Sequence, residues 1–208
     1  MSKRENVLLT IFFAIIFTIT IFATKDLVFI DNKEKIDPVE VEKVMFELVN
    51  NYRVANNSPP LVYAPWLEKG AQIRASEMAE YGSLRYVDRN GIEKTHTRSD
   101  GSSWETVFSE IVAIEGEDRF LSENLVLVIV SRKKDADDLA HEMFSKWESS
   151  PEHNAAMLDE NNKTFVFKFA QIPRYVESEE LFPWHDTYIG VQHFDTYSHN
   201  NIGKINSE

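Results

Sequence analysis

Apolar residues recur at the spacing of an α-helix in three long segments of the chain. Two of the segments begin with an aspartate suited to a helix N-cap, and Pro38 stands at the first helical position of the earliest one. The pattern therefore predicts three long helices that each bury one face. They cover residues 37–57, with Val41, Val44, Met45, Leu48 and Tyr52 buried; residues 65–83, with Leu67, Ala71, Ala75 and Met78 buried; and residues 135–150, with Leu139, Ala140, Met143, Phe144 and Trp147 buried.

Short apolar runs and period-two alternation predict β-strands in the second half of the chain. An apolar run covers residues 121–130, and residues 163–173 and 186–197 alternate between apolar and polar positions. We expect the last two segments to pair antiparallel across the loop 174–186. The order of the elements predicts an α+β domain in which helices cover both faces of a small, mainly antiparallel sheet.

Two local signals lie between the second long helix and the first strand. Asn90-Gly91 predicts a tight turn. Residues 102–111 predict a short helix in which Ser102 and Glu105 form a capping box. The apolar stripe of this short helix consists of Trp104, Val107, Phe108 and Ile111.

The first 24 residues differ from the rest in composition. Residues 7–24 are apolar apart from threonines, and as a helix they reach about 27 Å, close to the hydrocarbon thickness of a bilayer. Lys3 and Arg4 favour a cytoplasmic N-terminus. We expect an uncleaved signal-anchor in residues 1–24, a linker in 25–36, an extracytoplasmic domain in 37–196 and a flexible tail in 197–208. The alternative is a signal peptide cleaved after Ala23, which would release a secreted protein.

Charge and cysteine content exclude several kinds of function. The net charge is −12, and since the first 25 residues contribute +2, the remainder carries −14. An acidic domain of this kind disfavours nucleic-acid binding. The chain has no cysteine, which excludes disulfides, thiolate zinc sites and cysteine nucleophiles.

The candidate chemistry lies in histidines and one glutamate. His96 stands in a polar stretch, His153 just after Ser150-Pro151, and Glu123 at the head of an apolar run. If Ser150 caps a helix there, His153 is its third residue. The positive end of a helix disfavours imidazolium, and a neutral imidazole keeps the lone pair that a metal ligand or a general base needs.

The sequence surroundings of the other four histidines give less reason to place them in a functional site. His141 lacks the second histidine of a zinc-binding H-E-x-x-H helix, and we expect it to face solvent. His193 lies on one face of a strand, with a packing or surface role. His185 is in a turn that allows either role, and His199 is in the tail.

Several motifs together resemble a known family. In order, they are "LVNNYRVANNSPPL", "THTRSDGSSWETVF", "SENL", "KWESSPEHNAAML" and "YIGVQHF". They resemble the bacterial branch of the CAP superfamily, also called SCP domains, over about residues 39 to 195. The resemblance implies a three-layer α-β-α sandwich, which agrees with the order of elements.

The resemblance also implies a cleft. His96, Glu123 and His153 correspond to its two histidines and its first glutamate, a set able to hold a divalent cation, with zinc as the first candidate. The same three residues can instead form a metal-free hydrogen-bonded cluster. Ser150 occupies the place of the family's second glutamate. The neighbours expected to support the cleft are Arg98, Asn124, Trp147 and Ser150.

These features favour a membrane-anchored, extracytoplasmic binding module without enzymatic activity. We expect its ligand to be a cation or small molecule, a lipid, a protein or a cell-envelope component, and not a nucleic acid. The alternatives are a metal-assisted, peptidase-like hydrolase and a structural module that docks a partner.

Overall fold

The computed structural model describes residues 36–88, 90–108, 120–132, 134–173 and 185–197. The predicted signal-anchor, residues 25–35 of the linker, Ile111 and the tail from Ser198 lie outside these residues. None of the helices in the described ranges is long and apolar enough to cross a membrane.

The three predicted long helices are confirmed, and a fourth helix follows the third. In the first, Asp37 accepts a hydrogen bond from the backbone N–H of Val39, and in the third Asp135 accepts one from Asp138 N–H. Both aspartates are therefore N-caps, as the sequence predicts. The four helices are α2 (Pro38–Ala55), α3 (Pro65–Tyr81), α5 (Ala136–Ser149) and α6 (Pro151–Leu158).

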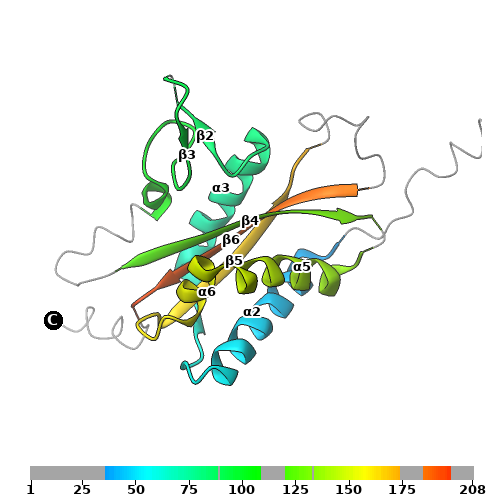
Figure 1. Cartoon of the computed structure of the whole chain (residues 1–208), viewed down its shortest axis with the longest axis vertical. Helices are drawn as coiled ribbons and strands as arrows, with labels where there is room; N and C mark the ends of the chain where they lie inside the picture. Colours follow the sequence, from blue (N-terminus) through cyan, green and yellow to red (C-terminus); the bar gives the residue numbers. More distant parts are fainter. Residues whose placement is uncertain (1–35, 89, 109–119, 133, 174–184, 198–208) are drawn as a thin grey trace, which may run out of the picture. The chain divides into compact units, whose positions relative to one another are not determined.

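The sheet contains four strands in the order β1-β5-β6-β4. Figure 1 shows β6 between β5 and β4. β5 and β6 pair antiparallel, as predicted, and β4 pairs antiparallel with β6. The two-residue strand β1 is parallel to β5, so the sheet is mainly antiparallel and β4 forms one edge. The strands are β1 (Val62–Tyr63), β4 (Leu121–Ser131), β5 (Thr164–Gln171) and β6 (His185–Asp195).

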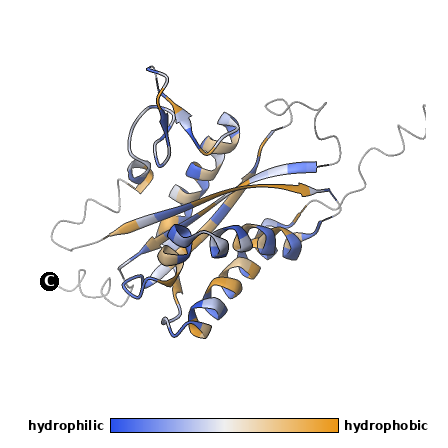
Figure 2. Ribbon diagram, in the orientation of Figure 1, coloured by the Kyte–Doolittle hydropathy of each residue, from blue (hydrophilic) through white to orange (hydrophobic). Residues whose placement is uncertain are grey.

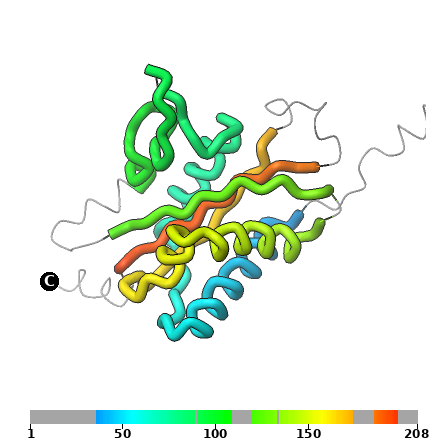
Figure 3. Tube along the Cα trace, in the orientation of Figure 1, coloured from blue at the N-terminus to red at the C-terminus, as the bar shows by residue number. Residues whose placement is uncertain are grey.

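Alternating strand residues separate the core into two layers. One face of the sheet, with Val126, Val128 and Phe167, packs against the buried faces of α2 and α5. The opposite face, with Val166 and Val191, packs against α3. Figure 2 shows that apolar and polar residues alternate along the helices, and Figure 3 shows the sheet between α3 and the other helices. The α-β-α sandwich is confirmed.

The segment between α3 and β4 confirms one local prediction and corrects another. Strands β2 (Tyr86–Val87) and β3 (Glu93–Lys94) form a hairpin whose turn includes Gly91 at φ 76°. The predicted capping box is wrong. Ser102 Oγ donates instead to Asp100 Oδ1 at 2.6 Å, and up to residue 108, where the described segment ends, a 3₁₀ helix, η1 (Trp104–Phe108), follows. The local Asp100 turn competes for the serine hydroxyl that the box requires.

Gly190 in β6 is needed because α5 packs closely on the sheet. A Cβ at this position would lie 2.8 Å from Met143 Sδ and 2.9 Å from Val126 Cγ1. We expect Gly190→Ala to lower the free energy of unfolding by about 1–3 kcal/mol, the usual cost of overpacking a core. Urea unfolding of the full chain measures this loss. Gln171→Ala, at an exposed position of β5, is the control, with an expected change within about 0.5 kcal/mol. An equal effect of both variants would contradict the packing argument.

Candidate functional site

Glu123 is the centre of a buried polar cluster on the α3 face of the sheet. It lies near the start of β4, and its side chain is fully buried. Arg74 of α3 donates from Nε to Oε2 of Glu123 at 3.0 Å and from Nη2 to Oε1 at 3.4 Å. The two residues form a buried, two-pronged ion pair between a helix and an edge strand.

Two histidines complete what we call the Glu123 cluster, which consists of Arg74, His96, Glu123 and His193. His96 Nδ1 lies 2.9 Å from Glu123 Oε1, and His193 Nε2 lies 3.0 Å from Oε2. His193 stands directly opposite Glu123 in the pairing of β4 with β6. Both carboxylate oxygens of Glu123 therefore accept hydrogen bonds from within the protein.

Aromatic rings enclose His193. Trp104 stacks on its ring at a centroid distance of 5.0 Å and an interplanar angle of 6°, and Phe108 meets it edge-on at 4.8 Å. Gly70 of α3 allows this packing, since a Cβ there would clash with the ring of Phe108. The lack of a side chain at Gly70 thus allows η1 to pack closely against α3. The remaining ring nitrogen of His193, Nδ1, is buried without a hydrogen-bond partner.

The electrostatics of the cluster keep the carboxylate charged and His193 neutral. Burial alone would raise the pKa of Glu123, but hydrogen bonds from His193 and His96 and the positive charge of Arg74 outweigh burial and hold this pKa far below its usual range. Burial lowers the pKa of His193 by more than its contacts with Glu123 raise it. A neutral His193 donates its Nε2–H to the carboxylate, which leaves Nδ1 as the free lone pair.

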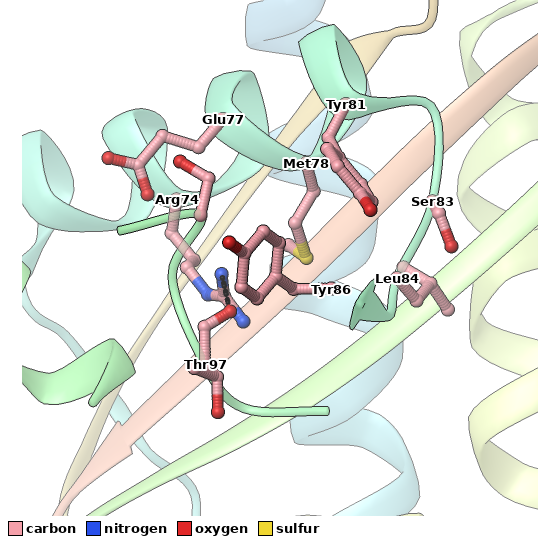
Figure 4. A pocket seen from close by; sticks show the side chains of 9 residues that line it. Arg74, Glu77, Met78, Tyr81, Ser83, Leu84, Tyr86 and Thr97 are labelled. Atoms are coloured by element: carbon pink, nitrogen blue, oxygen red, sulfur yellow. Dashed lines mark hydrogen bonds between the residues drawn. The ribbon is translucent and has the colours of Figure 1, made fainter. Parts of the chain in front are cut away.

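The loop that carries His96 is fastened to α3. His96 has a left-handed backbone at φ 55°, which is uncommon for a residue other than glycine. Arg74 Nη1 donates to the next carbonyl, Thr97 O, at 3.1 Å, as Figure 4 shows. Arg98 forms an ion pair with Glu77 of α3. Arg98 thus ties the loop to the helix, while its predicted role in supporting a cleft stays a prediction.

A small pocket opens beside Arg74, between the end of α3 and the start of the hairpin. Tyr81, Tyr86 and Met78 line it, with Thr97 at the far side (Figure 4). Its volume of about 10 Å³ is enough for about one water molecule. The pocket is therefore too small to be a ligand site.

His153 approaches from the opposite face of the sheet. As predicted, Ser150 is in the N-cap position, Pro151 begins α6 and His153 is its third residue, although the Ser150 side chain caps no N–H group. Asn124, next to Glu123 but facing the other way, donates from Nδ2 to His153 O at 3.0 Å and to Gln192 Oε1 at 3.2 Å. Trp147 Nε1 donates to Leu125 O at 3.1 Å.

His153 and His96 interact electrostatically across the edge of the sheet. Burial lowers the pKa of His153, the charge of Glu152 opposes this, and the charge of His96 lowers it further. The sequence predicted a neutral imidazole because of the helix terminus, and burial, the largest cause of the lowered pKa, acts in the same direction.

Two members of the cluster were not predicted as site residues. Arg74 lies on the apolar stripe of α3, seven positions after Leu67 and four before Met78. A permanent cation on a buried helix face requires a buried partner. The place of Arg74 on the apolar stripe was therefore the sequence feature that could have identified it. His193 was assigned only a packing or surface role. No local signal distinguishes it, because its partner is 70 residues away. The prediction that His141 faces solvent is confirmed, since 53% of its side chain is exposed.

The predicted metal role of His96, Glu123 and His153 stays a prediction. In the part of the chain that the structure describes, no group of three or more histidine, aspartate or glutamate side chains is arranged to hold a metal ion. The geometry gives a reason, because both Glu123 oxygens already accept hydrogen bonds from the protein. The three side chains as placed do not fit a cation bound by all of them.

One comparison with known proteins identifies a family, and another shows a similar fold. The sequence model of the "CAP: Cysteine-rich secretory protein family" matches residues 46–177. The fold is similar to that of an outer surface protein from Borrelia burgdorferi, with a TM-score of 0.51 and 17% identity over 80% of this chain and 99% of that one. No curated protein matches the sequence significantly.

Two further solved structures are less similar. One is an extracellular protein containing a SCP domain from Bacillus anthracis, with a TM-score of 0.46 and 16% identity over 74% of this chain. The other is a cysteine-rich secretory protein from Staphylococcus aureus, with a TM-score of 0.45 and 11% identity over 79% of this chain. The matches span only 39% and 41% of these two longer proteins.

The buried ion pair leads to a stability prediction. Arg74→Met leaves the Glu123 carboxylate buried without its permanent cation, and we expect a loss of about 3–5 kcal/mol in the free energy of unfolding. Adding Glu123→Gln to Arg74→Met should recover part of that loss, which a double-mutant cycle measures. The control is Arg85→Met, which breaks the exposed pair with Glu93 and should cost at most about 1 kcal/mol. Similar losses for Arg74→Met and Arg85→Met would contradict the proposed importance of the pair.

The lowered pKa values predict loss of stability in acid. Below about pH 6.5 the unfolded chain protonates its histidines while His193 in the folded state stays neutral, so acid favours unfolding. Glu123 adds to the loss as the pH falls below about 4.3, the value of an unfolded glutamate. Thermal unfolding between pH 7.5 and 5 should show His193 contributing a slope of up to about 1.4 kcal/mol per pH unit. His193→Gln should flatten this slope and His141→Gln should not. If His193→Gln leaves the slope unchanged, the pH dependence of stability comes from groups other than His193.

Proposed function

The chain belongs to the cysteine-rich secretory protein (CAP) family, and on that basis we propose that it acts outside the cytoplasm as a non-enzymatic binding module. In this proposal the ligand contacts His96 and His153 at the edge of the sheet. The N-terminal apolar segment would hold the domain at the membrane, in agreement with its length and with the positive charges before it.

The observation that supports the proposal most is that both carboxylate oxygens of Glu123 already accept hydrogen bonds from the protein. Arg74, His96 and His193 occupy both of its oxygens, and its side chain has no exposed surface. A general base must reach the proton that it removes, and a carboxylate fixed in this way does not reach solvent. Glu123 therefore suits the role of an internal anchor that orients other groups.

His96 is the group that this anchor orients. In its neutral form His96 would donate Nδ1–H to the Glu123 carboxylate and keep the lone pair on Nε2, and 46% of the side chain is exposed. Metal-binding histidines commonly donate their second N–H to a carboxylate in this manner. A divalent cation, zinc first among them, would then be held by His96 and His153, with Glu123 behind His96. Such a cation would supply positive charge to which an anionic ligand group could bind.

The two alternatives differ in what they require. A metal-assisted hydrolase needs a positioned base, and Ser150 stands where the family's second glutamate would lie. A purely structural module needs no ligand at all. The exposed imidazole of His96 and its left-handed backbone support ligand contact over a bracing role, because a brace needs no exposure.

Zinc titration of the full chain by calorimetry tests the cation part of the proposal. We expect binding that His96→Ala and His153→Ala each abolish and that His141→Ala, at an exposed histidine of α5, leaves unchanged. Glu123→Gln should weaken binding by about 10- to 100-fold without abolishing it, as loss of an orienting partner does. Absence of binding at millimolar zinc, or equal binding by all variants, would reject a cation at this site.

The non-enzymatic part needs a separate measurement. The full chain is incubated with casein and with purified cell-envelope material, and product release is followed for the wild type, His96→Ala and Glu123→Gln. We expect no turnover in any of them. Turnover that both substitutions remove would replace the binding module with the hydrolase.

A further inference from the structure

α6 carries His153 but contributes little to its own stability. It has eight residues, and Met157 is its one buried residue. Helices this short are marginal unless other elements hold them. The position of His153 therefore depends on the contacts at the two ends of α6. Asn124 holds the backbone at the first end through His153 O.

Side chains satisfy four successive carbonyl groups at the other end. Arg53 donates from Nη1 to Met157 O at 2.6 Å and to Asp159 O at 3.0 Å. Ser58 Oγ donates to Leu158 O at 2.9 Å, and Asn162 Nδ2 donates to Ala156 O at 3.0 Å. The last carbonyls of a helix normally lack partners, so this end of α6 is fastened by side chains.

Arg53 is the main component of this attachment. It lies in the last turn of α2 and is fully buried, and its Nε donates to Pro59 O at 2.7 Å. All three of these hydrogen bonds go to carbonyl oxygens. The positive charge sits at the negative end of α6, where the helix dipole favours a cation. Burial lowers the pKa of Arg53, and the charges of Asp159 and Glu160 oppose this.

We infer that Arg53 is a positioning residue for His153: it fixes the C-terminal end of α6 and thereby the orientation of the helix that presents the imidazole. An α6 of eight residues extends about 12 Å, so fraying or rotation at its end reaches His153. The inference rests on the proposed function only in treating His153 as a site residue.

The experiment compares Arg53→Met with Lys43→Met in the full chain. Lys43 lies on the same helix with 60% of its side chain exposed and serves as the matched control. Carbethoxylation by diethyl pyrocarbonate, followed by mass spectrometry, gives the reaction rate of His153 relative to exposed His141. We expect this ratio to change at least about threefold in Arg53→Met, because hydrogen bonds to a charged donor are lost, and to stay constant in Lys43→Met. Arg53→Lys, which keeps the charge but not the planar fork, should give an intermediate ratio.

Hydrogen exchange separates positioning from general destabilisation. Amides of residues 152–162 should exchange about tenfold faster in Arg53→Met, relative to those of β4 and β6 in the same sample. Uniform acceleration across the domain, or an unchanged His153 ratio in the folded variant, overturns the inference. If Arg53→Met does not fold, Ser58→Ala is measured instead, because it removes one hydrogen bond to a carbonyl group at the same end of α6. A changed ratio in that variant then supports the inference, and an unchanged one rejects it. Neither readout needs a bound ligand, so a negative zinc titration leaves this test intact.

Discussion

The buried pairing of Arg74 with Glu123 is the interaction on which the candidate site depends. It joins α3 to the edge strand β4, and the same guanidinium also holds the carbonyl of Thr97 in the loop beside His96. The guanidinium of Arg74 thus fixes the position of both the Glu123 carboxylate and the loop backbone that carries His96. A buried carboxylate without such a partner would take up a proton or face solvent, and His96 would then lose its fixed acceptor.

The alternation of β4 and β6 distributes the polar groups over both faces of the sheet. Glu123 pairs with His193 toward α3, while Asn124 pairs with Gln192 toward α6, one position along each strand. The first pair contacts His96 and the second holds the backbone of His153. Consecutive residues of the edge strand β4 therefore contact the His96 side chain and the His153 backbone. Glu123 is the central carboxylate of the cluster, and both of its oxygens are used internally.

Polar side chains fasten the parts that carry the histidines. The loop of His96 is tied to α3 by Arg74 and Arg98, and the end of α6 is tied by Arg53. Burying charged side chains costs free energy that apolar residues would not, and such groups are retained in some proteins because they specify one geometry. Here the buried arginines act at the two places where an imidazole must be oriented.

The sequence by itself determined the elements and their packing faces. Helical and period-two spacing placed the buried faces of α2, α3 and α5 and the strands of the sheet, and Ser150-Pro151 placed His153 at the third residue of α6, because each of these depends on neighbours a few positions away. Tertiary structure alone decided the partners of the buried polar residues. Periodicity indicates which face Arg74, His193 and Arg53 occupy, but their contacts lie 49, 70 and 104 residues away. It also decided that Glu123 is enclosed, since the residues that occupy its oxygens come from α3, β6 and a loop. A spacing pattern predicts which face of a helix or strand is buried. It does not predict which residues of a distant element pack against that face, because folding alone brings them together.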